Sequence, residues 1–234
     1  MTPLAPRALL WLAITVAAYV AARALQARLR DHPLANTVLV PAAVVVALLS
    51  LTRTPGTQYQ DATHVLLWIL GPATVALAVP LRVNARVVRR VAPAALASLV
   101  AGSVTAVVTA VGIAWALGAE PQTLRSLAPK SVTTPIAMGI AQAIGGAPPL
   151  AAVFVIATGA VGALSGGALF DRLGVRDVRA RGFAMGVAAH GMGTARAFQV
   201  DLTAGVFSSV GMTLNGIVTA VVLPVLWQAL GGPP

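Results

Sequence analysis

The sequence has no cysteine and very little charge. Of its 234 residues, 9% are charged and 58% are hydrophobic, and the mean hydropathy is +0.86. The absence of cysteine excludes disulfides, thiolate metal sites and cysteine nucleophiles. Because soluble domains carry about 25% charged residues, this composition excludes a soluble enzyme, a nucleic-acid-binding domain and a disordered chain. The lipid bilayer is the solvent that fits this chain.

Sequence motifs for common catalytic chemistries are also missing. We find no Walker loop, no usable Gly-x-Gly-x-x-Gly pattern and no paired carboxylates. The three histidines, His32, His64 and His190, are too far apart in the sequence to indicate a metal site. We therefore expect a protein that is not an enzyme and that holds no metal or cofactor.

Long apolar stretches are abundant. At roughly 20 residues per helical span, we predict an all-α, polytopic integral membrane protein with about seven to eight membrane segments. We expect these segments to form a single domain over residues 1–234. The stretches assigned as segments are Ala8–Leu25, Leu34–Leu51, Val65–Leu81, Ala92–Leu117, Leu127–Ile144, Leu150–Phe170, Gly182–Phe198 and Gly205–Leu230.

The third, fifth and seventh of these segments contain helix-breaking residues, namely Pro72, then Pro129 and Pro135, then Gly191 and Gly193. Irregular backbone inside a membrane is tolerated only where it is buried in protein or lines a wet cavity. We therefore expect the functional residues in these three segments. A weak repeat that pairs Pro72 with Pro129 supports this view, because broken helices in matching places point to a transporter binding site.

Clusters of arginine between the apolar stretches determine the expected topology. The net charge of +10 would suggest nucleic acid in a soluble domain, but here the charge indicates the cytoplasmic face of a membrane. The last cluster stays on that face only if the fifth segment dips into the membrane and returns, or crosses it partly. The clusters are Arg23, Arg28 and Arg30; Arg82, Arg86, Arg89 and Arg90; and Arg172, Arg176, Arg179 and Arg181.

The fifth segment contains a stretch suited to binding an anion, Pro129–Pro135. It places Lys130 beside three hydroxyl groups, and helix-start amides, hydroxyls and an ammonium together bind carboxylates. Lys130 is the one lysine in a chain with fifteen arginines, which suggests that a compact point charge is needed here. The alternative is a lysine that extends from a helix end to the membrane interface. The three hydroxyl groups belong to Ser131, Thr133 and Thr134.

The seventh segment contains a second polar stretch, Gly186–Arg196. His190 could carry a proton near physiological pH, and Arg196 could bind a carboxylate with its guanidinium fork. Gly191 and Gly193 would allow unwinding, and in a helix Thr194 would share a face with His190. The alternative is an interior histidine that hydrogen-bonds a neighbouring carbonyl, with Arg196 paired to an aspartate near the interface.

At these residues the sequence resembles the LrgB/CidB family of bacterial membrane proteins. The resemblance runs through Leu70–Leu81, Pro129–Met138, Ala180–Arg196 and Phe207–Ser209, and it covers nearly the whole chain. One departure is Gln199, where the family usually has glutamate. The resemblance implies either control of murein hydrolase activity and autolysis or carboxylate transport. For control of autolysis, the resemblance implies a small LrgA/CidA membrane partner. For carboxylate transport, the relevant relatives are the plastidial glycolate/glycerate translocator and bacterial pairs that are associated with pyruvate transport.

These observations lead to two hypotheses for a multi-pass protein of the bacterial inner membrane. In the first, the chain transports a small monocarboxylate such as pyruvate, glycolate or glycerate, alone or with an LrgA/CidA-like partner, and forms a homo-oligomer. Lys130 and Arg196 would hold the carboxylate, and His190 would carry a coupled proton. Hydrogen bonds would come from Ser131, Thr133, Thr134 and Thr194. In the second, the chain is an antiholin-like regulator of lysis that transports nothing.

Overall fold

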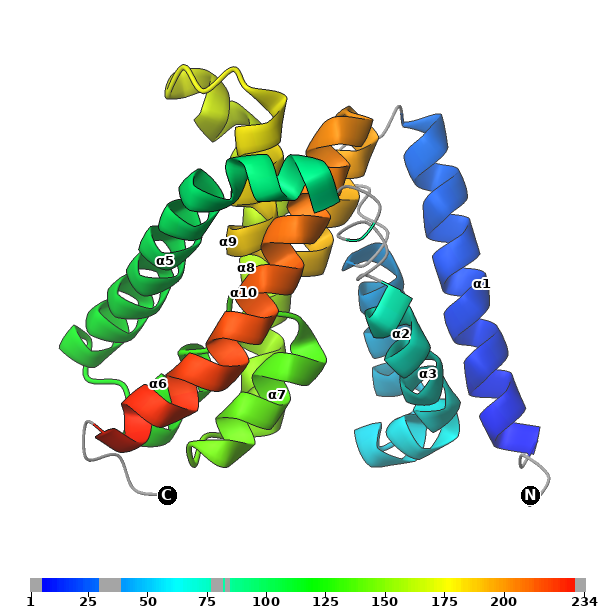
Figure 1. The fold of residues 1–234 in the computed structure, drawn as a ribbon. Coiled ribbons are helices and arrows are strands. Elements are labelled where there is room, and N and C mark those ends of the chain that lie inside the picture. Colours follow the sequence, from blue (N-terminus) through cyan, green and yellow to red (C-terminus); the bar gives the residue numbers. More distant parts are fainter. Residues whose placement is uncertain (1–5, 30–38, 77–81, 83–84, 230–234) are drawn as a thin grey trace. The chain divides into compact units, whose positions relative to one another are not determined.

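The computed structural model describes residues 6–29, 39–76, 82 and 85–229, and all regular secondary structure in these residues is helical (Figure 1). The all-α prediction is confirmed for this part of the chain. The chain forms two compact units, Met1–Ala76 and Leu77–Pro234, which we describe separately. Arg30, His32 and the predicted segment ends Leu34, Leu81 and Leu230 lie outside the described residues.

The described residues of the first unit form three helices, α1 (Pro6–Arg28), α2 (Leu39–Leu51) and α3 (Gly56–Ala76). Trp11 of α1 packs edge-on against Tyr59 of α3, with ring centroids 5.7 Å apart. The Thr15 hydroxyl lies 3.0 Å from the Tyr59 hydroxyl and adds a polar contact to this packing. Pro72 lies inside α3, which begins well before the predicted segment because hydropathy marks apolar residues and not helix ends.

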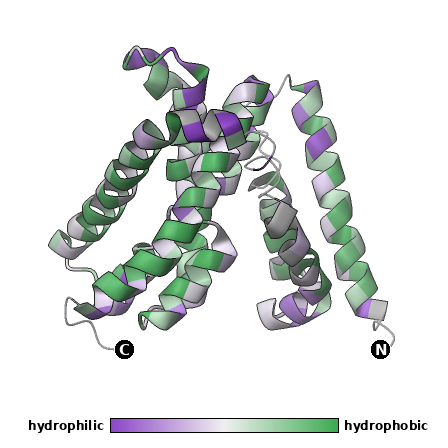
Figure 2. Cartoon of the chain, viewed as in Figure 1, coloured by the Kyte–Doolittle hydropathy of each residue, from purple (hydrophilic) through white to green (hydrophobic). Residues whose placement is uncertain are grey.

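The second unit contains the remaining helices. These are α5 (Ala85–Ala116), α6 (Pro121–Leu127), α7 (Thr134–Ala143), α8 (Pro148–Arg172), α9 (Val178–Val200) and α10 (Leu202–Ala229). Among the described residues, four stretches are long and apolar enough to cross a membrane: Arg7–Arg28 and Val91–Ala116, together with α8 and α10. Figure 2 shows apolar residues along most of their length. The larger predicted number of membrane segments is not confirmed as full crossings.

The fifth predicted segment is a short excursion of the chain that follows α6, and we call it the Lys130 hairpin (the link 128–133 and α7). At its base the Ser126 hydroxyl accepts a hydrogen bond from the Ala147 amide at 2.8 Å, and Arg125 donates to the Gly145 carbonyl at 3.3 Å. The chain therefore returns at residue 147 to the level that it left at residue 126. Pro135 lies in the first turn of α7, where its missing N–H leaves no helical bond unmade.

Helix α9 is also a hairpin, which we call the His190 hairpin (residues 178–200). Its backbone reverses at His190, where φ is 41° and ψ is −130°. On the first arm, Gly182 packs against Ala204 and Gly186 packs against Ser208, so this arm runs parallel to α10. On the second arm, Thr194 lies beside Ser208 and Phe198 lies beside Gly205, so this arm runs antiparallel to α10.

The two hairpins enter the second unit from opposite ends. The base of the Lys130 hairpin lies where α5 ends and α8 begins, whereas the His190 hairpin starts and finishes beside the N-terminus of α10. The start of α5 and the turn after α8 line one cavity together. The arginines of residues 86–89 and 172–181 therefore lie at the same end, which we call the arginine-rich end. This is the arrangement expected if the fifth segment enters the membrane and returns.

Candidate functional site

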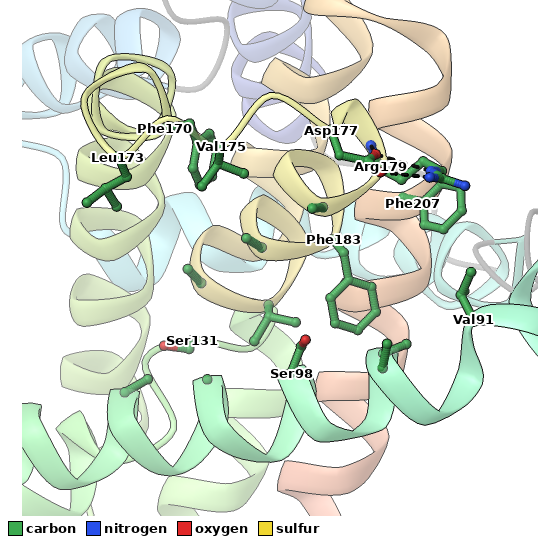
Figure 3. A pocket seen from close by; sticks show the side chains of 18 of the residues that line it. Val91, Ser98, Ser131, Phe170, Leu173, Val175, Asp177, Arg179, Phe183 and Phe207 are labelled. Carbon is green, nitrogen blue, oxygen red and sulfur yellow. Dashed lines mark hydrogen bonds and ion pairs between the residues drawn. The ribbon is translucent and has the colours of Figure 1, made fainter.

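A cavity of about 610 Å³ lies between α5, the link of the Lys130 hairpin and the first arm of the His190 hairpin (Figure 3). Helix α5 forms one wall through the small residues Ala94, Ser98, Gly102 and Ala106. Phe183 points toward this wall in Figure 3, and Val187 lies against it, 3.2 Å from a Cβ atom placed at Gly102. Phe207 also lines the cavity. The cavity is therefore mainly apolar, and its charged residues decide which ligands it can hold.

Lys130 and Ser131 contribute the polar end of the cavity that lies deepest in the helical bundle. The Lys130 ammonium donates a hydrogen bond to the Ser131 hydroxyl, with 3.2 Å between Nζ and Oγ. Among the described residues, no carboxylate lies within ion-pair distance of Lys130. An ammonium that meets only a neutral hydroxyl can bind an incoming carboxylate without first breaking an ion pair.

Asn215 of α10 holds the link of the Lys130 hairpin in place. Its Nδ2 donates to the Ser131 carbonyl at 3.0 Å and to the Val187 carbonyl at 3.1 Å, and Ser103 donates to its Oδ1 at 2.6 Å. The side chain is buried, with 1% of its surface exposed. One amide thus joins both hairpins to α5 and α10. The sequence alone predicts only a helix-packing role for Asn215, because no local pattern shows which carbonyls it meets.

His190 lies at the reversal of its hairpin and is buried against α8. Its Nε2 lies 2.9 Å from the Val155 carbonyl, which can only accept, so the ring donates from this nitrogen. A Cβ atom added at Gly159 would lie 2.7 Å from the His190 ring, so the ring fits only against glycine. This geometry matches the predicted alternative of an interior histidine bonded to a carbonyl, and it leaves Nδ1 for proton exchange.

Neither His190 nor the remaining predicted residues line the cavity. Thr194 donates to the His190 carbonyl at 2.8 Å and lies 2.9 Å from the Ser208 hydroxyl. Arg196, on the second arm of the His190 hairpin, donates to the side-chain oxygen of Gln199 at 3.2 Å. Thr133 is the N-cap residue of α7 and Thr134 opens that helix. The structure thus brings Lys130 and Ser131 together in the cavity and places Thr194 and Arg196 outside its lining.

The glycines and prolines that were predicted to interrupt helices have different roles in the structure. The chain reverses at His190, one residue before Gly191. Gly193 allows the two arms to touch, because a Cβ atom there would lie 2.5 Å from the Met185 carbonyl oxygen. Pro129 is buried in the turn that follows α6. Close packing between the arms, and not unwinding, therefore explains Gly193.

An ion pair that the sequence analysis did not identify lines the cavity at the arginine-rich end. Asp177 is the N-cap residue of α9 and accepts from the Arg179 amide at 2.8 Å. The Arg179 side chain donates to both carboxylate oxygens, at 2.7 Å and 3.1 Å. This hydrogen-bonding guanidinium lowers the pKa of Asp177 to about 2, so the pair stays charged at physiological pH. The Asp-x-Arg spacing in the sequence could have indicated this ion pair.

The sequence of this chain is similar to those of known proteins. The model of the LrgB-like family matches residues 15–229. A protein of Bacillus subtilis named YwbG is 36% identical over 213 residues, which cover 91% of this chain and 94% of that protein. Holin-like protein CidB of Staphylococcus epidermidis is 28% identical over 220 residues, covering 94% of this chain and 96% of that protein. No solved structure matches this chain.

Proposed function

We propose a function from the premise that this chain belongs to the LrgB-like family and is a bacterial membrane protein. The proposed function is transport of small monocarboxylates such as pyruvate, glycolate or glycerate across the bacterial inner membrane, without catalysis. The observation that carries the proposal is the position of Lys130. The one lysine of the sequence lines a cavity at the point where two opposed hairpins meet.

Opposed hairpins that meet inside a helical bundle suit a transport site. Discontinuous helices expose backbone groups and polar side chains at mid-membrane depth, and the surrounding protein shields them from lipid. Here the link of the Lys130 hairpin and the first arm of the His190 hairpin are joined by a single amide, that of Asn215. A movement of either hairpin would open the cavity from one end and close it from the other.

Within the site, we assign the carboxylate to Lys130 and Ser131. A small acid offers little apolar area, so charge-assisted hydrogen bonds must supply most of its affinity. His190 remains our candidate for a coupled proton, through the Nδ1 atom. His190, Thr133, Thr134, Thr194 and Arg196 all lie outside the cavity lining, and their contact with substrate stays a prediction. A homo-oligomer and an LrgA/CidA-like partner likewise remain proposals.

A second function is supported by the name of a relative. The Staphylococcus protein is called holin-like, and by analogy this chain would act in the murein hydrolase system as an antiholin-like regulator of lysis. In that case Lys130 and His190 would serve helix packing or contact with a partner. The two functions differ in one measurable respect, which is whether the protein alone moves a carboxylate.

A flux experiment tests the proposal. Purified protein in proteoliposomes, with and without an LrgA-like partner, should take up labelled pyruvate, glycolate or glycerate. Lys130→Gln should reduce the flux at least tenfold, because it removes the charge that meets the carboxylate. The matched control is Arg176→Gln, which removes one positive charge from an exposed turn. Absence of flux for all three acids under both conditions would overturn the transport proposal and favour the regulatory one.

A further inference from the structure

The charged residues that line the cavity differ in what they offer to a ligand. Lys130 donates to the neutral hydroxyl of Ser131, whereas Arg179 is engaged through two nitrogens by the Asp177 carboxylate. Arg179 therefore has no uncompensated charge to give a second anionic group. Among the described residues that line the cavity, Lys130 is thus the cation without an anionic partner, and the cavity suits one carboxylate.

The wall along α5 is made of small residues, and Ser98 gives it one hydroxyl group. Ala94, Ser98, Gly102 and Ala106 recur every four residues, so they lie on one face of the helix. Ser131 lies beside the Gly102 end of this face, because Asn215 joins the Ser131 carbonyl to Ser103. From Gly102 to Ala94 the helix rises about 12 Å. An extended six-carbon acid, with C–C bonds of about 1.5 Å, is shorter than ~8 Å and fits along this wall.

Polar substituents on such a chain would find few hydrogen-bond partners. Apart from the Ser98 hydroxyl, the side chains along this path offer no hydrogen bonds, because they are those of Ala94, Ala95, Phe183 and Val187. A polar group buried there loses its bonds to water without replacement. A three-carbon acid, in turn, leaves most of the 610 Å³ cavity without apolar contact.

We propose that this cavity binds monocarboxylates with an unbranched apolar chain of about four to eight carbons, and that it discriminates against dicarboxylates. The carboxylate binds Lys130, and the chain extends along α5 toward the Asp177–Arg179 pair. The inference rests on the proposed function, because it names the substrate class of the same site. The short acids of the proposed function would occupy only the Lys130 end of the cavity, where the Ser131 hydroxyl can meet their oxygen atoms.

The chain-length test uses calorimetric titration of the detergent-purified full chain. Hexanoate should bind about fifteenfold tighter than butyrate, because each of its two additional buried methylenes improves affinity about fourfold. Adipate, which has six carbons and a second carboxylate, should bind at least tenfold more weakly than hexanoate. Hexanol, which has no carboxylate, should also bind at least tenfold more weakly. Equal affinity for butyrate and hexanoate, or for adipate and hexanoate, would overturn the proposal.

Two variants connect the titration to this cavity rather than to the detergent micelle. Ser98→Phe fills the wall about 6 Å from Gly102, within reach of hexanoate, and should weaken hexanoate binding at least tenfold more than butyrate binding. Its matched control is Val104→Phe on the same helix, where the side chain is exposed and does not line the cavity. Lys130→Gln should abolish the preference for hexanoate over hexanol. Equal effects of the two phenylalanine variants would contradict the proposed path of the chain.

Flux and binding separate the two proposals. If labelled pyruvate is not transported but the titrations show the expected series, transport is wrong and the ligand class stands. If pyruvate is transported but affinity does not rise with chain length, the ligand class is wrong and transport stands. Unchanged thermal unfolding of the two phenylalanine variants would show that both have folded.

Discussion

Asn215 and Ser131 are joined by a hydrogen bond of 3.0 Å, from the side-chain amide to the backbone carbonyl, where the two hairpins meet. The same amide nitrogen reaches the Val187 carbonyl at 3.1 Å, three residues before the reversal at His190. A single side chain of α10 therefore positions Lys130 relative to His190. The site depends on a residue that touches no substrate in our proposal, which makes Asn215 a positioning residue.

Replacing Asn215 with leucine should loosen this junction. A leucine side chain could not donate to the two carbonyls or accept from Ser103, and each buried group left without a partner costs about 1–3 kcal/mol. We expect Asn215→Leu to lower the thermal unfolding temperature and to weaken carboxylate binding measured by titration. Thr213→Val on the same helix is the control, because its hydroxyl bonds only to the Ser209 carbonyl in its own helix. Wild-type affinity in Asn215→Leu would contradict the positioning role.

Gly186 should be intolerant of even a methyl group. A Cβ atom there would collide with the Ser208 carbonyl of α10, so Gly186→Ala must push α9 and α10 apart. Overpacking of this kind costs about 1–3 kcal/mol. Gly167→Ala in α8 is the matched control, because nothing lies within 4 Å of the added atom and alanine favours the helix. The thermal unfolding temperature should therefore fall for Gly186→Ala and stay unchanged or rise for Gly167→Ala.

His190 combines a strained backbone with a buried ring, and two substitutions separate these roles. Its φ of 41° lies in a region that favours glycine, and such strain costs about 1–3 kcal/mol. Both His190→Gly and His190→Ala lose the bond to Val155, but only the glycine variant relieves the strain. His190→Gly should therefore unfold at a higher temperature than His190→Ala.

The same pair tests proton coupling. If His190 carries the coupled proton, both variants should lose the pH dependence of pyruvate flux in proteoliposomes. Flux with wild-type pH dependence in both would contradict the proton role and leave the conformational role intact.

Cysteine labelling should show that the two arginine clusters face the same side of the membrane. The sequence contains no cysteine, so single cysteines can be introduced without background. We expect Arg86→Cys and Arg176→Cys to be protected from an impermeant reagent in intact cells, and Ala119→Cys, between α5 and α6, to react. External reaction at position 176 would show that the fifth segment crosses fully, contrary to the hairpin geometry.

Lys130 could be identified from the sequence because it is the one lysine in an arginine-rich chain and lies between two prolines. The all-α fold class and the approximate positions of the apolar segments could also be predicted, because long apolar stretches are visible in the sequence itself. The reversal of α9 could not. No proline interrupts residues 178–200, and the reversal occurs at His190 and not at a glycine. Tertiary packing against α8 and α10 determines that turn.

The hydrogen-bond partners of the polar residues also could not be predicted from the sequence. Nothing near Asn215 in the sequence indicates that it reaches residues 131 and 187, which lie far away along the chain. Asp177 and Arg179 are neighbours in sequence, but their place at the cavity follows from the path of α5. Residue types and spacing therefore indicated which groups were chemically suited to a site, and only the fold showed which of them come together.

Because each hairpin enters and leaves at one end, neither changes the side on which the chain continues. Helices α5, α8 and α10 each run from one end of the second unit to the other, so an odd number of passes separates Ala85 from Ala229. A fluorescent or enzymatic tag fused after α10 would then report on the compartment opposite to that of the turn between α8 and α9. A partner that recognises the tail and one that recognises this turn could not compete, because the bilayer would lie between them.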